Sequence, residues 1–463
     1  MIRLKVSLTR LKHWIVNLFK CVHKVSSLKK KSFPYAFHYS FLRLLHWTGL
    51  IHLPNSSHSV RLNKLHQIYS WSVHFMLVET SGLLIVSLLF RSIHDTKDFM
   101  EKLIEVLFAM TFTAEILLIK IHIQKVLDLI NYMEDHFLPV PPEIKKDCWK
   151  EEMITVVVVA SSLMSVLIAR IHETFLPWPQ HDLDLIRELY GKKNPERLLP
   201  SNLWVPWIDT SEPIIYNIFY AYTTLMLILY LIAMAYCVLQ ITLFLTPLEG
   251  QFKVLAKCLA QLGRIPRDPL GMYVWTPEEI LAVDKSSRLL YKPYSQKIRH
   301  PLKHYNDLCA IQCIKFSQIL YKFIEKYRAF NSVVRDFTAV LLSTCVILSL
   351  YQIATLGQMS NHVIGKFICE FFLATVASWC VIRQSERFQT CQDLLRAGVT
   401  HCSVQHLSSK TRKNLCMTLM QADRFAKITF LKGVYVVDNM TLIKLFKIGY
   451  TLVNFIRWSN KSN

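Results

Sequence analysis

The pattern of hydrophobic and polar positions along the chain is dominated by long apolar stretches. Seven of them approach or exceed the roughly 20 residues that a helix needs to cross a lipid bilayer. They cover residues 66–90, 102–121, 154–175, 214–245, 330–354, 363–382 and 440–457. A shorter apolar piece at 41–53 suits a helix that leads into the first span from the cytoplasmic side. The pattern predicts an all-α, seven-transmembrane helical membrane protein.

Two segments between the later spans also carry helical patterns. Residues 302–327 place apolar side chains at helical spacing, and further helices are expected at 388–395 and at 408–422, after a Ser-Ser-Lys-Thr-Arg start. Helices with both charge and an apolar stripe rarely stand alone in water. We therefore expect segments 246–329 and 383–437 to form cytoplasmic subunit contacts within a single membrane domain, 1–463.

The distribution of Lys and Arg predicts the orientation of the spans. The first 64 residues contain about a dozen basic residues and no acidic one, and segments 246–329 and 383–439 are also basic, whereas the loop after the third span is slightly acidic. Because basic flanks stay in the cytoplasm, the N-terminus is expected inside and the C-terminus outside. Residues 1–64 would include a basic amphipathic helix on the membrane surface.

Composition narrows the class of protein further. The chain is 52% hydrophobic and 19% charged, with only 11 glycines, which disfavours a Gly-rich β-barrel or a nucleotide-loop enzyme. A net charge of +21 would suggest nucleic acid in a soluble protein. Here the basic residues flank spans, so we expect contact with the lipid bilayer and no nucleic acid.

Candidate chemistry is sparse. The sequence has no phosphate-binding loop, no Gly-x-Ser-x-Gly and no His-Glu-x-x-His, so no enzymatic activity and no cofactor are expected. Cys309 and Cys313 lie one helical turn apart, but no further cluster in the sequence completes a metal site, and none is predicted. The sequon at Asn55 would face the cytosol and stay unmodified.

Three local patterns carry a resemblance to a known family. The loop before the fourth span reads Leu199-Pro-Ser-Asn-Leu-Trp-Val-Pro-Trp-Ile-Asp209, then Ser211-Glu-Pro213 and Tyr216. Gln384-Ser385-Glu386 follows the sixth span, with Arg412-Lys413 and Met420-Gln421-Ala422 further on. The last span contains Lys447-Ile-Gly-Tyr-Thr-Leu-Val-Asn-Phe-Ile-Arg457. In this order, and with seven inverted spans, they resemble the insect odorant receptor family.

That resemblance implies a tuning subunit of a ligand-gated, nonselective cation channel, not the co-receptor. It also implies a heterotetramer with the odorant receptor co-receptor, in the plasma membrane of olfactory sensory neurons, gated by a small volatile odorant. The resemblance covers the C-terminal two-thirds well and the N-terminal third by topology alone. Leu452 and Val453 replace an aromatic pair usual in the family, which affects the transfer of pore contacts but not of the fold.

The last span, in segment 438–458, would line the central pore. Lys447, Thr451 and Asn454 share one helical face, whereas Leu452 and Phe455 share another. Hydrophobic constrictions close pores by expelling water, and Phe455 falls at the position that resembles the family's hydrophobic gate. The alternative is that Leu452 and Phe455 only pack against the fifth span.

The resemblance places the odorant pocket in the outer half of the second, third, fourth and sixth spans. For any single aromatic residue there, ordinary core packing is the alternative. Glu370 could meet a hydroxyl or amine of the ligand, or form an interhelical hydrogen bond to His172 or a tyrosine. The candidate ligand-binding residues are Leu107, Phe108, Thr111, Ser165, Ile168, His172, Tyr216, Phe219, Tyr220, Thr223, Phe367, Glu370 and Phe371.

Other classes of membrane protein fit the residues less well. A G-protein-coupled receptor would have the opposite orientation and an Asn-Pro-x-x-Tyr motif in its seventh span, and a transporter would show an internal repeat. An insect gustatory receptor-type channel is the nearest rival. Its last span ends in a Thr-Tyr-apolar-Gln-Phe pattern, whereas Gly449-Tyr450 here comes without the Gln.

Overall fold

The computed structural model shows a protein built almost entirely from helices. It describes residues 36–53, 60–94, 96–175, 178–201, 203–262, 302–354, 361–402, 404, 407–424, 429–430, 435–436 and 439–462. The helices are α2 (Ala36–Trp47), α3 (Val60–Phe90), η1 (Ser92–His94), α4 (Thr96–Ile121), α5 (Ile123–His136), α6 (Pro142–Glu173), α7 (Gln180–Tyr190), α8 (Pro213–Gln261), α10 (Leu302–Ala354), α11 (Asn361–Thr400), α12 (Ser409–Arg424) and α13 (Asn439–Ser462). Two short strands, β1 (Thr429–Phe430) and β2 (Tyr435–Val436), pair antiparallel before α13.

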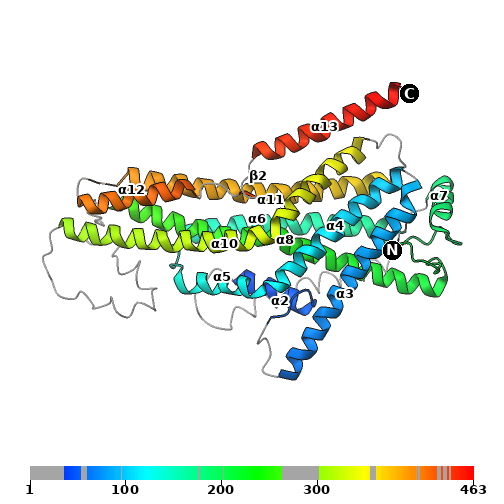
Figure 1. The fold of residues 1–463 in the computed structure, drawn as a ribbon, viewed down its shortest axis with the longest axis horizontal. Coiled ribbons are helices and arrows are strands. Elements are labelled where there is room, and N and C mark those ends of the chain that lie inside the picture. Colours follow the sequence, from blue (N-terminus) through cyan, green and yellow to red (C-terminus); the bar gives the residue numbers. More distant parts are fainter. Residues whose placement is uncertain are drawn as a thin grey trace.

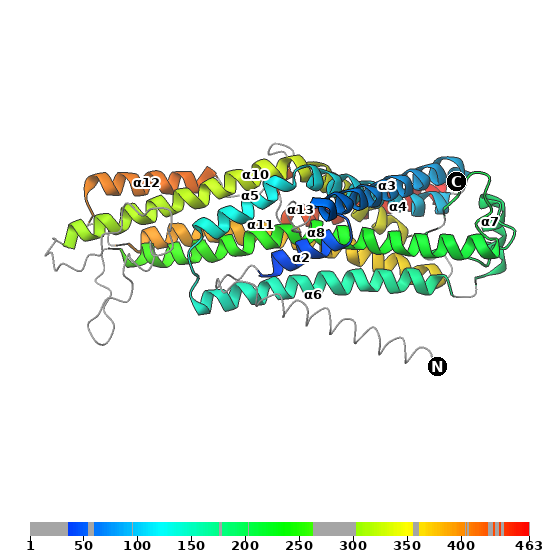
Figure 2. The ribbon, with the colours of Figure 1, turned by 90° about the horizontal axis from the view of Figure 1, so that it is seen from below.

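The long helices run side by side in an elongated bundle, with α7 at one end and α12 at the other (Figures 1 and 2). Helix α8 has 49 residues and α10 has 53. At 1.5 Å per residue each extends beyond about 70 Å, more than twice the roughly 30 Å of a bilayer core. One part of the bundle can therefore cross a membrane while the rest continues into water.

The seven predicted spans lie in α3, α4, α6, α8, α10, α11 and α13, which confirms the all-α fold class. By length and composition alone, four helices of the described residues are suited to crossing a membrane: Arg61–His94, Pro142–Glu173, Pro213–Ala260 and Gly365–Thr400. A fifth candidate is the pair Asp98–Ile121 and Ile123–His136, bent by 66°. The orientation of the spans stays a prediction.

The helices predicted beyond the membrane are also present where the structure describes them. The pattern at 302–327 forms the first half of α10, and 388–395 continues α11 without a break. Helix α12 begins as its sequence predicts, because the Ser408 hydroxyl accepts the backbone N–H of Thr411 at 3.2 Å. Their role in subunit contacts stays a prediction.

A core of aromatic residues joins these extensions. The ring centres of Phe137 and Phe323 lie 5.2 Å apart, and both side chains are buried. The Gln251 side chain of α8 accepts a hydrogen bond from the backbone N–H of Leu138 and donates one to its carbonyl, both at 2.9 Å. Both buried backbone groups of Leu138, in the connection between α5 and α6, therefore have hydrogen-bond partners. The close approach of α8 and α11 at Gly398 continues this packing, since a Cβ there would lie 2.8 Å from the Ala256 carbonyl oxygen.

Some sequence predictions fall on residues outside the described ranges. These are the basic surface helix within residues 1–35, the sequon at Asn55, and the part of segment 246–329 that covers residues 263–301.

Helix α13 packs along α10 by one face (Figure 1). Leu445 and Val453 are buried, and Gly449 lies against the Leu350 side chain. The Phe446 ring meets Phe371 of α11 in an edge-on contact, with centres 6.3 Å apart. The small residue in the middle of this helix therefore serves packing within the chain, and the opposite face of α13 is left uncovered.

Candidate functional site

A cavity of about 120 Å³ lies inside the bundle, next to the loop that precedes α8. Helices α3, α4, α6, α8 and α11 surround it, together with that loop. Most of its wall is apolar and comes from Leu84, Ile104, Phe108, Ala109, Phe112, Val166, Pro200, Leu203, Met226, Leu227, Leu231, Met234 and Leu373. The polar lining residues are Thr80, Glu105, Arg170, Ser201, Thr223, Tyr230 and Glu370.

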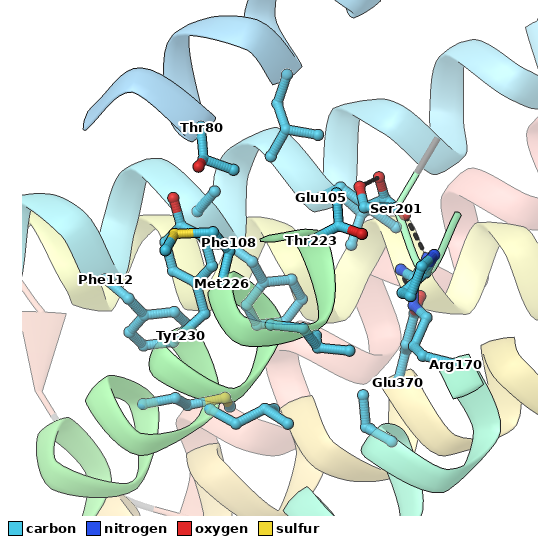
Figure 3. Close-up of a pocket in the computed structure, with 18 of the residues that line it drawn as sticks. Thr80, Glu105, Phe108, Phe112, Arg170, Ser201, Thr223, Met226, Tyr230 and Glu370 are labelled. Atoms are coloured by element: carbon cyan, nitrogen blue, oxygen red, sulfur yellow. Dashed lines mark hydrogen bonds and ion pairs between the residues drawn. The ribbon is translucent and has the colours of Figure 1, made fainter. Parts of the chain in front are cut away.

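The polar groups are not spread evenly around the cavity. Figure 3 shows Glu105, Arg170, Ser201 and Glu370 gathered on one side, with Phe112 and Tyr230 on the other. The cavity therefore has a charged end and an aromatic end. Such a space suits a small, mainly apolar molecule with one polar group to fix its orientation.

The aromatic end is held by interhelical hydrogen bonds and stacking. Phe108 and Phe112 are successive on one face of α4, and their rings stack with centres 5.8 Å apart. The Tyr230 hydroxyl donates to the Leu77 carbonyl at 2.8 Å and lies 2.9 Å from the Ser81 hydroxyl. These contacts join α8 to α3 and leave the ring face of Tyr230 to the cavity (Figure 3).

The charged end is centred on Arg170 of α6. Its guanidinium pairs with Glu105 of α4 and, at 2.5 Å, with Glu370 of α11. Glu105 also accepts from Lys102 at 2.6 Å and from the Ser201 hydroxyl at 3.0 Å. All three ions of the central triad are less than one-tenth exposed, and buried ions persist only when they are paired and hydrogen-bonded.

The network continues away from the cavity through Lys366 of α11. Its ammonium pairs with Glu101 and lies 3.5 Å from Glu173 and 3.9 Å from Glu105. The charges of three helices distant in sequence thus meet at one place. The partner of Glu370 is Arg170, which corrects the expectation that His172 or a tyrosine would fill that role.

The loop before α8 is fixed to α3 beside the cavity. The Trp204 backbone N–H donates to the Ser87 hydroxyl at 2.7 Å, and the Arg91 guanidinium lies 4.4 Å from the centre of the Trp204 ring. Leu203 is 1% exposed and Ser201 reaches Glu105. The loop therefore supplies part of the cavity wall and is held there by the Trp204 backbone and by the Ser201 side chain.

Asp209 and Ser211, singled out in the sequence, stabilise the turn that follows. Asp209 accepts from the Ser211 backbone N–H at 2.9 Å and from its hydroxyl at 2.6 Å. Desolvation opposes its ionisation, but the hydrogen bonds from Ser211 and from the backbone of Lys193 outweigh it and lower the pKa of Asp209. The Ser211 hydroxyl in turn accepts the backbone N–H of Asn194 at 3.0 Å.

The structure brings three of the thirteen candidate ligand residues to the cavity: Phe108, Thr223 and Glu370. Ile168 and His172 are exposed, whereas Thr111 and Phe367 are buried away from the cavity wall. Tyr216 and Tyr220 lie beside each other nearer the start of α8, with ring centres 5.7 Å apart. The remaining candidates, also outside the lining, are Leu107, Ser165, Phe219 and Phe371.

Sequence reasoning missed two contributors to the cavity, α3 and the loop. Thr80 and Leu84 lie on the first span, which was not among the four expected, and Ser201 belongs to the loop. Glu105 and Arg170 are ionisable residues within the predicted spans 102–121 and 154–175. That signal could have placed them in the site, because intramembrane charges usually face an interior cavity or one another.

The candidate pore residues lie on the uncovered part of α13. Lys447, Thr451 and Asn454 are exposed, and the Thr451 hydroxyl donates to the Lys447 carbonyl at 2.8 Å. Phe455 is 64% exposed, so within the single chain it is not packed away against α10. The side chain of Leu452 lies outside the described residues.

Comparison with known proteins gives a match at the level of structure. No protein-family model and no curated protein matches the sequence. Olfactory receptor OR5 of the insect Machilis hrabei superposes with a TM-score of 0.64 at 12% identity, over 92% of this chain and 99% of that one. The same receptor in complex with eugenol superposes with a TM-score of 0.62 at 14% identity, over 91% of this chain and 98% of that one. The chain therefore has the fold of the insect olfactory receptors, as its sequence patterns predicted.

Proposed function

We propose that this chain is an insect odorant receptor that binds a small volatile molecule in the cavity among α3, α4, α6, α8 and α11. The observation that carries the proposal is a cavity with mainly apolar walls and one charged end, inside a fold shared with a receptor solved with eugenol. Apolar walls supply most of the binding free energy for an odorant-sized ligand, and a few polar groups orient it.

The polar groups favour ligands that can donate or accept one hydrogen bond. Thr223 lines the middle of the wall, while Glu105 and Glu370 present carboxylate oxygens near the charged end. Arg170 already shares its guanidinium between those two carboxylates. A ligand hydroxyl would add one hydrogen bond to this network and leave each buried ion with its partner. Separating such an ion from its partner would cost several kcal/mol.

We further propose that the chain acts as a tuning subunit of a ligand-gated, nonselective cation channel, together with the odorant receptor co-receptor. In this assembly α13 of each subunit lines a central pore, and Phe455 contributes to an apolar gate. The uncovered face of α13 supports this, because Lys447, Asn454 and Phe455 remain available to other subunits and to water. The subunit would lie in the plasma membrane of olfactory sensory neurons with its N-terminus inside.

Opening would follow from a shift in population between two arrangements of the helices. A ligand favours the open arrangement only to the extent that it binds that arrangement more tightly. Helix α11 lines the cavity through Glu370 and Leu373, and its neighbouring Phe371 touches Phe446 of α13. Movement at the cavity therefore has a direct route of packed side chains to the proposed pore helix.

The test of the binding site compares two half-buried phenylalanines, one in the cavity lining and one outside it. Phe108 lines the cavity, whereas Phe219 of α8 lies outside its lining and packs against Tyr222. The chain and each alanine variant are expressed with the co-receptor, and dose–response curves are recorded under an odorant panel. Phe108→Ala is expected to shift the half-maximal concentration of the best agonist by about tenfold or more, because it removes buried apolar contact.

Phe219→Ala is expected to leave that concentration within about twofold of the unchanged chain. Surface expression of both variants is measured by the same tag, so that a loss of protein is separated from a loss of affinity. Equal shifts in the two variants, or no shift with Phe108→Ala, would place the odorant elsewhere.

A further inference from the structure

Three histidines converge at the opposite end of α3 from the cavity. His46 lies in the last turn of α2, His52 lies in the following turn, and His66 lies in the second turn of α3. One ring nitrogen from each lies within 4.8 Å of the other two. The Nδ1 atoms of His52 and His66 are 3.0 Å apart, and the rings of His46 and His66 stack with centres 3.6 Å apart.

A backbone hydrogen bond sets the tautomer of the central ring. The Nε2–H of His66 donates to the His46 carbonyl at 2.7 Å. This leaves the lone pair on Nδ1 of His66, the atom that faces His52. An imidazole that donates its other N–H to a carbonyl is the usual arrangement of a metal-bound histidine, because the hydrogen bond fixes the ring and raises its basicity.

The turn between the histidines is held against α3 by a glycine. Gly49 has φ +77°, and a Cβ on it would lie 2.7 Å from the Tyr69 ring and 2.9 Å from Val73. The backbone of Ile51 donates to the Leu45 carbonyl at 3.1 Å, and both residues are fully buried. The three rings are therefore presented by a closely packed turn, not by a long free loop.

We propose that His46, His52 and His66 bind a transition-metal ion, Zn²⁺ in particular, that ties the turn after α2 to α3. Three imidazoles are a ligand set that Zn²⁺ accepts, with a fourth position open to water or another small ligand. The His66 ring keeps its hydrogen bond, so the His46 ring stacked on it has to rotate about χ2 to direct a lone pair at the ion, which releases the Leu53 backbone N–H that its Nδ1 accepts at 3.3 Å. That torsion is soft in histidine. His52 moves its proton from Nδ1 to Nε2 when the ion binds.

The site is separate from the odorant cavity and independent of the proposed function. Thr80, where α3 reaches the cavity, is fourteen residues beyond His66, or about 20 Å along the helix. Nothing in the sequence spacing indicated the cluster, because the ligands come from a helix end, a turn and another helix. A positive charge faces it from α4, where the Lys120 ammonium lies over the Trp71 ring.

The test uses the purified full-length chain, stripped with a chelator and titrated with Co²⁺. Four-coordinate Co²⁺ with nitrogen and oxygen ligands shows visible d–d bands, and it lacks the thiolate charge-transfer band that the cysteines would produce. We expect such bands at one Co²⁺ per chain, lost on addition of Zn²⁺. His94, an exposed histidine of η1, provides the matched control as His94→Ala.

The variants are the triple change His46→Ala, His52→Ala, His66→Ala and the milder His52→Gln, which keeps a polar side chain of similar size in the turn. We expect the triple variant to lose the bands, His52→Gln to weaken Zn²⁺ binding by about tenfold or more, and His94→Ala to behave as the unchanged chain. If size-exclusion elution shows that the triple variant does not fold, the Zn²⁺ affinity of His52→Gln is the measurement that tests the proposal. Absence of bands in the unchanged chain, bands with thiolate character, or unaltered binding in His52→Gln would overturn the proposal.

Discussion

Arg170 shows how a single residue can organise a site that its sequence neighbourhood does not reveal. Its guanidinium joins carboxylates that lie 65 and 200 positions away along the chain. The sequence identifies each of these ions as costly within a span, but helical spacing relates only residues on the same helix. The individual charges could therefore be predicted, whereas their mutual pairing and their place at the cavity could not.

Removal of the charge at Arg170 should be far more damaging than removal of an exposed arginine. Arg170→Met leaves Glu105 and Glu370 buried without their main partner, a loss expected to cost about 3–5 kcal/mol. Arg187 pairs with Asp184 at 3.0 Å with both side chains half exposed, so Arg187→Met should change stability by less than about 1 kcal/mol. Thermal unfolding of the two variants in detergent measures the difference, and similar melting temperatures would show that the triad is not a significant stabilising unit.

At the scale of helices, the hydrophobic pattern predicted the helices that contain the seven expected spans and the polar extensions of α10 and α11. Helices α8 and α11 are longer than the spans predicted within them, because the pattern of a helix that leaves the membrane changes from apolar to amphipathic without a break in the helix. Helix α13 carries a small residue, Gly449, in the middle of its apolar run. Gly449 packs against Leu350 of α10 in the same chain, and the opposite face of α13 is the uncovered one.

The close contact between α8 and α11 at Gly398 gives a prediction, for which Gly82 of α3 provides the control. A Cβ at Gly398 would lie 2.8 Å from the Ala256 carbonyl oxygen, so Gly398→Ala must separate two backbones and should destabilise the fold by about 1–3 kcal/mol. Gly82 of α3 has open space around it. Gly82→Ala should be neutral or stabilise by up to about 1 kcal/mol through helix propensity. Melting temperatures that fall equally in both variants would refute this account of the helix contact.

The uncovered face of α13 gives the second prediction at this scale. Phe455 and Tyr450 are both about two-thirds exposed but lie on different sides of the helix. If Phe455 forms an apolar gate, Phe455→Ala should raise the current in the absence of odorant, because the constriction would stay wetted. Tyr450→Ala, with the same co-receptor and comparable surface expression, should leave the resting current unchanged. A leak in Tyr450→Ala alone would assign the gate to another face.

At the scale of the whole molecule, the all-α fold that the sequence predicts is an elongated helical bundle with the fold of the insect olfactory receptors. The loop motif around Trp204 and Asp209 was recognised from its residues, and the structure explains it as an anchored turn beside the cavity. The cavity itself could not be placed from sequence, since α3 and the loop join it through tertiary contacts that no periodicity encodes. The composition of its wall supports the proposed odorant as ligand.

The most direct test of the central proposal is electrical recording from purified protein in lipid vesicles, with the co-receptor and without any G protein or nucleotide. We predict that an odorant identified by the panel evokes a nonselective cation current, and that Phe108→Ala shifts its dose dependence to higher concentration. An odorant response in intact cells that disappears in this purified system and returns only with a G protein and GTP would contradict a ligand-gated channel.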